Sequence, residues 1–134
     1  MAIVTKGRGY VYSLQYHLVW CVKYRHEVIS GDIEEFLCGI LHKVASDNGF
    51  QITELNTGKD HVHLLLDCKP QHYIPSMVKI LKGVSGRALM QKFGDELRVK
   101  LWGGHIWNPS YFVATISENT ESQVREYIRS QKRG

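Results

Sequence analysis

The chain is poor in the residues that cross-link small extracellular domains or build membrane spans. It has three cysteines and three prolines among 134 residues. The cysteines lie inside apolar segments without CxxC or metal-ligand spacing, which indicates buried reduced thiols rather than a disulfide framework. No apolar run approaches the roughly 20 residues of a membrane helix, and residues 1–10 lack the apolar stretch of a signal peptide. We therefore expect a soluble, cytoplasmic protein that does not contact membranes.

The sequence also lacks several familiar catalytic signatures. It contains no P-loop, GxSxG, HExxH or paired-carboxylate arrangement. Internal repeats, linkers and low-complexity segments are absent as well. With 43% hydrophobic and 22% charged residues, the composition predicts one compact domain that spans residues 1–134 and has a real core.

The charge is unevenly distributed along the chain. The net charge is +4 and the isoelectric point is about 9.0. Residues 26–58 carry one basic residue against six acidic ones, whereas residues 69–100 carry seven basic residues against two acidic ones. This polarity fits a molecule with one face turned toward a polyanion. Solvated helix faces of opposite sign would explain the same pattern.

Two patterns describe the first third of the chain. Residues 10–24 are rich in aromatic and β-branched side chains with a partial period of two, which predicts one long strand. Asp32 and Glu35 fit a capping box, and the apolar spacing that follows predicts a helix that ends at Asn48.

The rest of the chain alternates between the same two kinds of element. Residues 50–55 and 61–68 are predicted strands joined by a hairpin linker. Residues 73–93 form a predicted helix that begins near a proline and contains two glycines. Residues 111–116 are a predicted strand, and a capping box at Thr120 predicts a last helix.

The predicted order of elements is βαββαβ followed by one helix. It indicates an α+β fold, a ferredoxin-like sandwich in which two helices cover one face of an antiparallel sheet. We expect this core at about residues 10–116 and the appended C-terminal helix at about residues 119–132. The other sheet face is left for a ligand, a nucleic acid, a partner subunit or the last helix.

His61-Val62-His63 is the sharpest local motif. On a strand, side chains two residues apart point to the same face, with roots roughly 6.6 Å apart. Two imidazoles at that distance can share a metal ion, which needs a third ligand and leaves positions for substrate oxygens. An HxH triplet more often consists of two ordinary polar or core histidines.

Tyr127 and Gln131 form a second candidate pair. They are four residues apart on the predicted last helix and therefore lie on one face. A tyrosine hydroxyl is a weak nucleophile at neutral pH because its free pKa is about 10, so a nearby cation would have to favour the phenolate. Taken alone, Tyr127 fits a core position of an amphipathic helix, and Gln131 fits a surface position.

The two pairs fit one reaction. A metal ion held by His61, His63 and the side-chain oxygen of Gln131 would polarise a phosphodiester that Tyr127 attacks. The other histidines have no such partner in the sequence, and we expect structural or surface roles for them.

Basic residues interleaved with aromatic ones form a third pattern. It includes Lys23 and Arg25 around Tyr24, and Lys82 and Arg87 in the second predicted helix. Cationic grooves with stacking surfaces hold single-stranded nucleic acid. Aromatic residues in a strand are otherwise core residues, so this pattern alone does not decide the question.

These motifs together resemble the single-tyrosine HUH transposases of the smallest bacterial and archaeal insertion sequences, the IS200-like transposases. HUH denotes two histidines around a hydrophobic residue, here Val62. The resemblance runs from about residue 10 to residue 131 and rests on five blocks in the correct order: YHLVWCVKYR at 16–25, KDHVHLLLD at 59–67, LKGVSGR at 81–87, LW and NPSYFVATI within 101–116, and EYIRSQ at 126–131.

The resemblance implies a chemistry for the candidate residues. Such proteins cut and rejoin single-stranded DNA at element ends through a 5′-phosphotyrosine, leaving a free 3′-OH. By position the nucleophile is Tyr127, the HUH ligands are His61 and His63, and the third ligand is Gln131. The resemblance favours Mg²⁺ or Mn²⁺ as the ion, although the ligand types alone also admit zinc.

The resemblance also implies partners. Members form obligate homodimers in which the tyrosine helix of one subunit typically completes the histidine site of the other, and they recognise subterminal DNA hairpins. As DNA contacts we predict Arg8, Lys23, Arg25, Lys82 and Arg87, which match no family motif.

Two alternative functions remain open from the sequence. One is a noncatalytic module that binds single-stranded DNA or RNA on a ferredoxin-like sheet. The other is a domesticated relative that processes repeated chromosomal hairpins, which the DNA flanking the gene would reveal.

Overall fold

The computed structural model describes residues 5–7, 10–12, 15–69, 73–101, 103–116 and 120–131. Its main body is a four-stranded antiparallel sheet with the order β4-β5-β3-β6. The strands are β3 (Gln15–Cys21), β4 (Gln51–Thr57), β5 (His61–Asp67) and β6 (Phe112–Thr115). Together with the two helices that cover one face of the sheet, this strand order gives the predicted ferredoxin-like α+β fold, which is confirmed.

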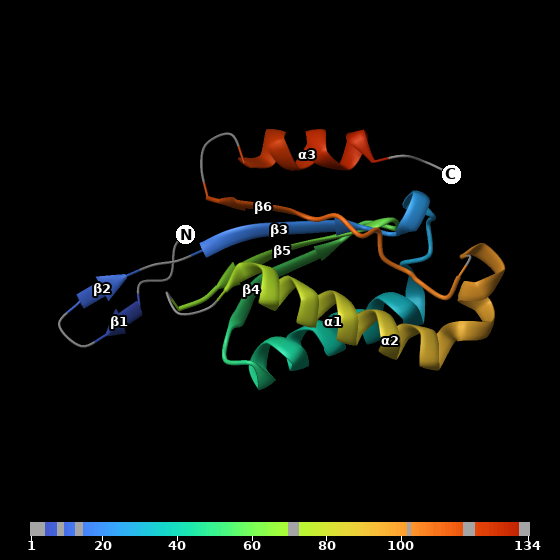
Figure 1. The fold of residues 1–134 in the computed structure, drawn as a ribbon, viewed down its shortest axis with the longest axis horizontal. Helices are drawn as coiled ribbons and strands as arrows, with labels where there is room; N and C mark the ends of the chain where they lie inside the picture. Colours follow the sequence, from blue (N-terminus) through green and yellow to red (C-terminus); the bar gives the residue numbers. More distant parts are fainter. Residues whose placement is uncertain are drawn as a thin grey trace.

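Helices lie on both faces of the sheet (Figure 1). Helices α1 (Gly31–Asp47) and α2 (Ile74–Lys100) cover one face. Helix α3 (Thr120–Ser130) lies on the other face, where it packs against β3 and β6. The predicted C-terminal helix therefore occupies the sheet face that the two main helices leave open.

The alternation of side chains along β5 divides the sheet into a core face and a site face. Val62, Leu64 and Leu66 are buried in the core cluster with residues of α1 and α2. His61 and His63 alternate with them and are only partly buried. Because successive strand residues point to opposite faces, both histidines lie on the face that carries α3.

The prediction of a single strand over residues 10–24 is wrong. A separate hairpin pairs β1 (Thr5–Gly7) with β2 (Tyr10–Tyr12), and β3 begins only at Gln15. At the other end the chain leaves the sheet in a 3-10 turn, η1 (Lys23–Arg25). Tyr24 and Arg25 have positive φ angles of 55° and 53°, which lie outside the geometry of a regular strand.

Helix α2 is longer than the predicted helix over residues 73–93. The backbone at Phe93 departs from helical geometry, with φ −119° and ψ 20°, and the helix then continues to Lys100. Leu97 in this extension is 1% exposed. Burial of its side chain explains why the helix resumes after the irregularity that sequence periodicity interprets as an end.

Two further expectations concern cysteines and membranes. All three cysteines are free thiols; Cys21 and Cys68 are buried, whereas Cys38 is partly exposed. Burial raises the pKa of the Cys21 thiol to about 11, so it stays protonated at neutral pH. Among the described residues, no helix is long and apolar enough to cross a membrane.

Candidate active site

His61 is held by a chain of polar contacts. Its Nδ1 lies 2.8 Å from Oδ1 of Asp60, and Arg25 Nε donates to Oδ2 of the same carboxylate at 3.0 Å. Burial alone would raise the pKa of Asp60, but the hydrogen bond from His61 and the charge of Arg25 outweigh it and leave the pKa below its usual value. An ionised carboxylate can only accept, so Nδ1 of His61 is the donor, and in the neutral imidazole the lone pair is on Nε2.

Gly58 leaves the space that the His61 ring occupies. It lies in the loop between β4 and β5, and its amide donates to the carbonyl of His61 at 3.0 Å. A Cβ atom at this position would overlap the His61 imidazole. The absence of a side chain at Gly58 therefore sets the ring position as much as Asp60 does.

His63 contacts His17, for which the sequence predicts a structural or surface role. His17 Nδ1 lies 2.8 Å from His63 Nε2, with ring centroids 5.1 Å apart. Burial lowers the pKa of His17, although the charge of Glu54 opposes this effect. This contact follows from the register in which β3 pairs with β5. Because Val19 pairs with His63, His17 lies diagonally across from it on the same face.

Tyr127 and Gln131 meet at one serine. Ser110 Oγ lies 2.8 Å from the Tyr127 hydroxyl and 3.2 Å from Gln131 Oε1. The Tyr127 ring packs over Phe112 of β6, with centroids 5.7 Å apart. Burial raises the pKa of Tyr127, and the hydrogen bond with Ser110 only partly offsets this. In this arrangement the phenol is therefore protonated at neutral pH.

Lys82 fixes the loop that carries Ser110. Its Nζ donates to the carbonyls of Asn108 and Ser110, at 2.5 and 3.0 Å. Burial lowers the pKa of this ammonium to about 8. The structure thus gives Lys82 a role inside the protein, next to the loop that binds Tyr127.

The two candidate pairs share one face of the sheet. His61 pairs with Cys21 across β5 and β3, and the amide of Asn108 donates to the Cys21 carbonyl at 2.9 Å. The Asn108–Ser110 loop is therefore level with His61 and two strand positions away, a distance of roughly 10 Å at the usual strand spacing. His61 and His63 lie on the same face of β5, and Tyr127 and Gln131 both contact Ser110.

A comparison with known families shows to which family the chain belongs. Residues 10–131 match the family model described as "Transposase IS200 like". The chain belongs to the IS200-like transposase family.

Relatives of this IS200-like transposase agree with the assignment. It is 52% identical over 126 residues to the ISDra2 transposase TnpA of Deinococcus radiodurans, covering 94% of this chain and 89% of the relative. It is 32% identical over 120 residues to the transposase for insertion sequence element IS200 of Salmonella typhimurium, covering 90% and 78%. The family resemblance found in the sequence is confirmed.

Solved structures agree with the fold. A crystal structure of a transposase from Deinococcus radiodurans superimposes with a TM-score of 0.91 and 47% identity, covering 97% of this chain and 99% of the other. A REP-associated tyrosine transposase, solved bound to a REP hairpin, has a TM-score of 0.58 and 15% identity, covering 92% and 68%. At that identity the second likeness concerns the fold alone.

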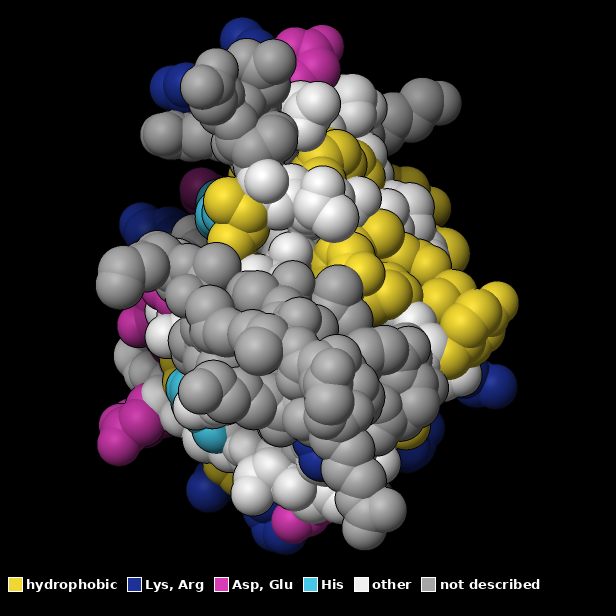
Figure 2. Space-filling model, turned by 90° about the vertical axis from the view of Figure 1, so that its left-hand side faces the viewer, with side chains coloured by type: hydrophobic (Ala, Val, Ile, Leu, Met, Phe, Trp, Pro, Cys, Tyr) yellow, Lys and Arg dark blue, Asp and Glu magenta, His cyan; other side chains and the backbone are white. Residues whose placement is uncertain are grey.

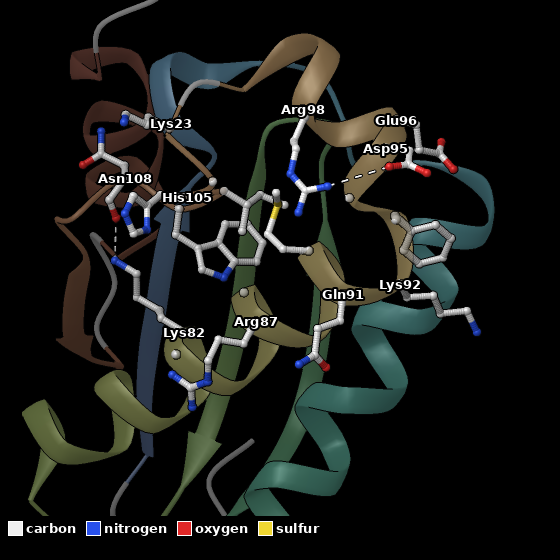
Figure 3. A pocket seen from close by; sticks show the side chains of 18 of the residues that line it. Lys23, Lys82, Arg87, Gln91, Lys92, Asp95, Glu96, Arg98, His105 and Asn108 are labelled. Carbon is white, nitrogen blue, oxygen red and sulfur yellow. Dashed lines mark hydrogen bonds and ion pairs between the residues drawn. The ribbon is translucent and has the colours of Figure 1, made fainter.

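The predicted DNA contacts of this transposase fall in different places. Arg8 lies outside the residues whose side chains are described. Arg25 is bound to Asp60, with only 13% of its side chain exposed, so it supports His61 instead of facing solvent. Lys23, Lys82 and Arg87 line one groove of about 1100 Å³ (Figure 3).

Proposed function

We propose that this family member cuts and rejoins single-stranded DNA at the ends of an insertion sequence through a 5′-phosphotyrosine at Tyr127. The observation that carries the proposal is the gathering of Tyr127, Gln131, His61 and His63 on one face of the sheet. We further propose that residues 1–134 act as a single domain in the cytoplasm and that the DNA partner carries subterminal hairpins.

The proposed step exchanges one phosphoester for another. The Tyr127 hydroxyl oxygen forms a bond to phosphorus, the bond from phosphorus to the 3′ oxygen breaks, and the phenol proton passes through water to that oxygen. The products are a 5′-phosphotyrosine and a free 3′-OH. Because the ester energy is conserved, the 3′-OH of another strand can reverse the step and join DNA without a nucleotide cofactor.

The residues fit a divalent cation at the histidine pair. His61 Nε2 carries a lone pair, since Asp60 holds Nδ1, which is the usual arrangement of a metal-binding histidine. Among the described residues, His, Cys, Asp and Glu side chains alone form no three-ligand site. The amide oxygen of Gln131 is the proposed third ligand with His61 and His63. A bound Mg²⁺ or Mn²⁺ would draw charge from the phosphate oxygens.

Tyr127 has to leave its present partner before it can react. Its hydroxyl is bound to Ser110, and its pKa is raised by burial. A cation near the phenol would lower that pKa and favour the phenolate. The contacts with Ser110 thus describe a resting position for both Tyr127 and Gln131.

Chelation is expected to stop covalent capture of DNA but to spare DNA binding. The cation acts on the scissile phosphate, whereas affinity for the strand comes mainly from Lys and Arg contacts to other phosphates. With EDTA in excess, protein–DNA adducts on a denaturing gel should vanish, while the dissociation constant from fluorescence anisotropy should change by less than about threefold. Added Mn²⁺ should restore the adducts. Undiminished adducts in excess chelator would refute metal dependence.

Gly58→Ala is expected to weaken cation binding. The new methyl group must push the His61 ring away from Asp60, and misplacing a ligand's support costs about 10- to 100-fold in metal affinity. Titration of Mn²⁺ followed by electron paramagnetic resonance measures the change directly. Gly39→Ala is the matched control, because a Cβ at Gly39 in α1 meets nothing within 4 Å. Equal Mn²⁺ affinities for both variants would contradict the proposed placement of the ion.

A homodimer with shared sites fits the surface of the molecule. Within the described sheet β6 is an edge strand, and an edge strand is a place where another chain can associate. Figure 2 shows hydrophobic side chains gathered on one flank, at the level of the sheet and below α3. Ile116 after β6 and Tyr73 before α2 are exposed, at 45% and 68%. We propose that the helix of one subunit carrying Tyr127 completes the histidine site of the other.

A noncatalytic module for single-stranded nucleic acid is the second candidate function. The observation that favours it is the engagement of the Tyr127 hydroxyl by Ser110. Such a module would bind DNA and form no covalent adduct under any condition. A domesticated relative would form adducts but would act on repeated chromosomal hairpins, so the DNA around the gene separates it from a mobile element.

A further inference from the structure

The groove of Figure 3 lies between one side of α2 and the loop that leads to β6. It is lined by five Lys and Arg residues and two acidic ones, which are Lys23, Lys82, Arg87, Lys92, Arg98, Asp95 and Glu96. Its volume of about 1100 Å³ exceeds the upper end usual for small-molecule pockets, about 1000 Å³. An open, cationic groove of this size suits a polyanionic chain better than a small ligand.

Two arginines mark the two ends of the α2 wall. Arg87 and Arg98 are exposed and project from α2 beside the groove (Figure 3). They are 11 residues apart in the chain, on either side of the irregularity at Phe93. Both side chains nevertheless line the same groove.

Each arginine lies over a glycine one turn earlier. A Cβ at Gly83 would come within 3.3 Å of Arg87 Nη1, and one at Gly94 within 2.7 Å of Arg98 Nη1. The arrangement is therefore repeated: each exposed guanidinium passes close to a backbone position that has no side chain. Asp95 contacts Arg98 only at 3.8 Å, with both side chains exposed, which is a weak pairing.

The opposite wall supplies flat and polar side chains. Trp107 forms part of it, fixed by a hydrogen bond from Nε1 to Ser85 Oγ at 3.1 Å. His105 on the same loop is exposed. Trp107 is only 8% exposed, so His105 is the ring that this wall presents to solvent. An exposed ring together with cations can hold unpaired nucleotides, because every base has a face that stacks.

The groove reaches the loop that leads to Ser110, since Asn108 and Pro109 line it. Lys82 lines the groove and donates to the carbonyls of Asn108 and Ser110. Ser110 in turn binds the Tyr127 hydroxyl. A strand lying along α2 would therefore pass the loop that holds the nucleophile.

We propose that this groove binds a segment of single-stranded DNA, with backbone phosphates against Arg87 and Arg98, and leads it to Tyr127. The inference rests on the proposed function, since it assigns the path of the DNA substrate to the active site. In this proposal Arg98, which no motif indicates, binds a backbone phosphate as Arg87 does.

The test measures binding without cleavage. In a Tyr127→Phe background, fluorescence anisotropy with a hairpin-free 20-nucleotide oligothymidylate gives the dissociation constant between 0.05 and 0.3 M NaCl. Each phosphate contact contributes about 0.7 to the slope of log affinity against log salt for single strands, so Arg87→Ala/Arg98→Ala should reduce the slope by about 1.4. At 0.1 M salt this corresponds to about 25-fold weaker binding.

Matched controls separate the groove from net charge. Lys43→Ala/Lys79→Ala removes the same charge from exposed positions that do not line the groove, and should leave the slope within about 0.3 of the parent value. Gly94→Ala should weaken binding by displacing the Arg98 guanidinium while keeping its charge. Thermal unfolding checks that each variant folds.

Two results would overturn the groove proposal. One is a slope for Arg87→Ala/Arg98→Ala equal to that of the lysine control. The other is an equal loss of affinity for a blunt 20-base-pair duplex, which would show a general attraction for polyanions. Neither result bears on Tyr127, because adduct formation by the protein with an intact tyrosine is measured separately.

Discussion

We expect Tyr127→Phe to abolish covalent protein–DNA adducts. Its affinity for single-stranded DNA should stay within about twofold of the wild-type value, because phosphate contacts provide most of the affinity. The change removes only the hydroxyl oxygen. The phenyl ring keeps its packing over Phe112, so the fold and the position of α3 are preserved. Incubation of each protein with labelled single-stranded DNA from the flanks of the gene, followed by a denaturing gel, measures the adducts.

The control for this change is Tyr111→Phe. Tyr111 lies next to Ser110, is partly buried and packs against the core, so its substitution makes the same chemical change one residue from the loop. Tyr111→Phe should form adducts at the wild-type level. Adducts that persist in Tyr127→Phe and disappear in Tyr111→Phe would identify Tyr111 as the nucleophile and overturn the assignment.

Mixing two inactive variants is expected to restore activity. If α3 of one subunit completes the histidine site of the other, a dimer of one His61→Ala and one Tyr127→Phe chain has one intact site and one doubly defective site. Random exchange at equal concentrations gives half mixed dimers, so about a quarter of the wild-type adduct yield should return. Either variant alone should give none.

The order and timing of mixing provide the control. Recovery should require conditions in which subunits exchange, such as co-refolding, and should be absent when separately folded dimers are combined briefly. A co-refolded mixture as inactive as both parents would show that each chain uses its own tyrosine with its own histidines. In that case α3 would have to move from Ser110 toward β5 within one subunit.

The sequence predicts the fold well where burial follows a regular period. Residues 61–68 alternate between core and site faces because Val62, Leu64 and Leu66 pack against the helices. Periodicity fails where tertiary contacts override it. The Phe93 irregularity does not end α2, since Leu97 is buried beyond it, and the positive φ of Tyr24 ends the strand pattern despite its aromatic side chains.

The candidate site is predictable to the extent that its residues are close in sequence. His61 with His63, and Tyr127 with Gln131, follow from spacing on a strand and on a helix. The residues that support them come from elsewhere in the chain. His17 reaches His63 through strand register, Arg25 reaches Asp60 through the η1 turn, and Ser110 reaches Tyr127 across 17 residues. Such contacts depend on packing that no local pattern records.

The chemistry at Tyr127 is tested most directly by locating the covalent bond itself. Wild-type protein is incubated with single-stranded DNA and Mg²⁺, the adduct is digested with protease and nuclease, and the modified peptide is sequenced by mass spectrometry. We predict a nucleotide joined through its 5′ phosphate to the Tyr127 oxygen, and a free 3′-OH on the released strand. A nucleotide attached to any other residue, or strand cleavage that leaves no attached nucleotide, would contradict the account.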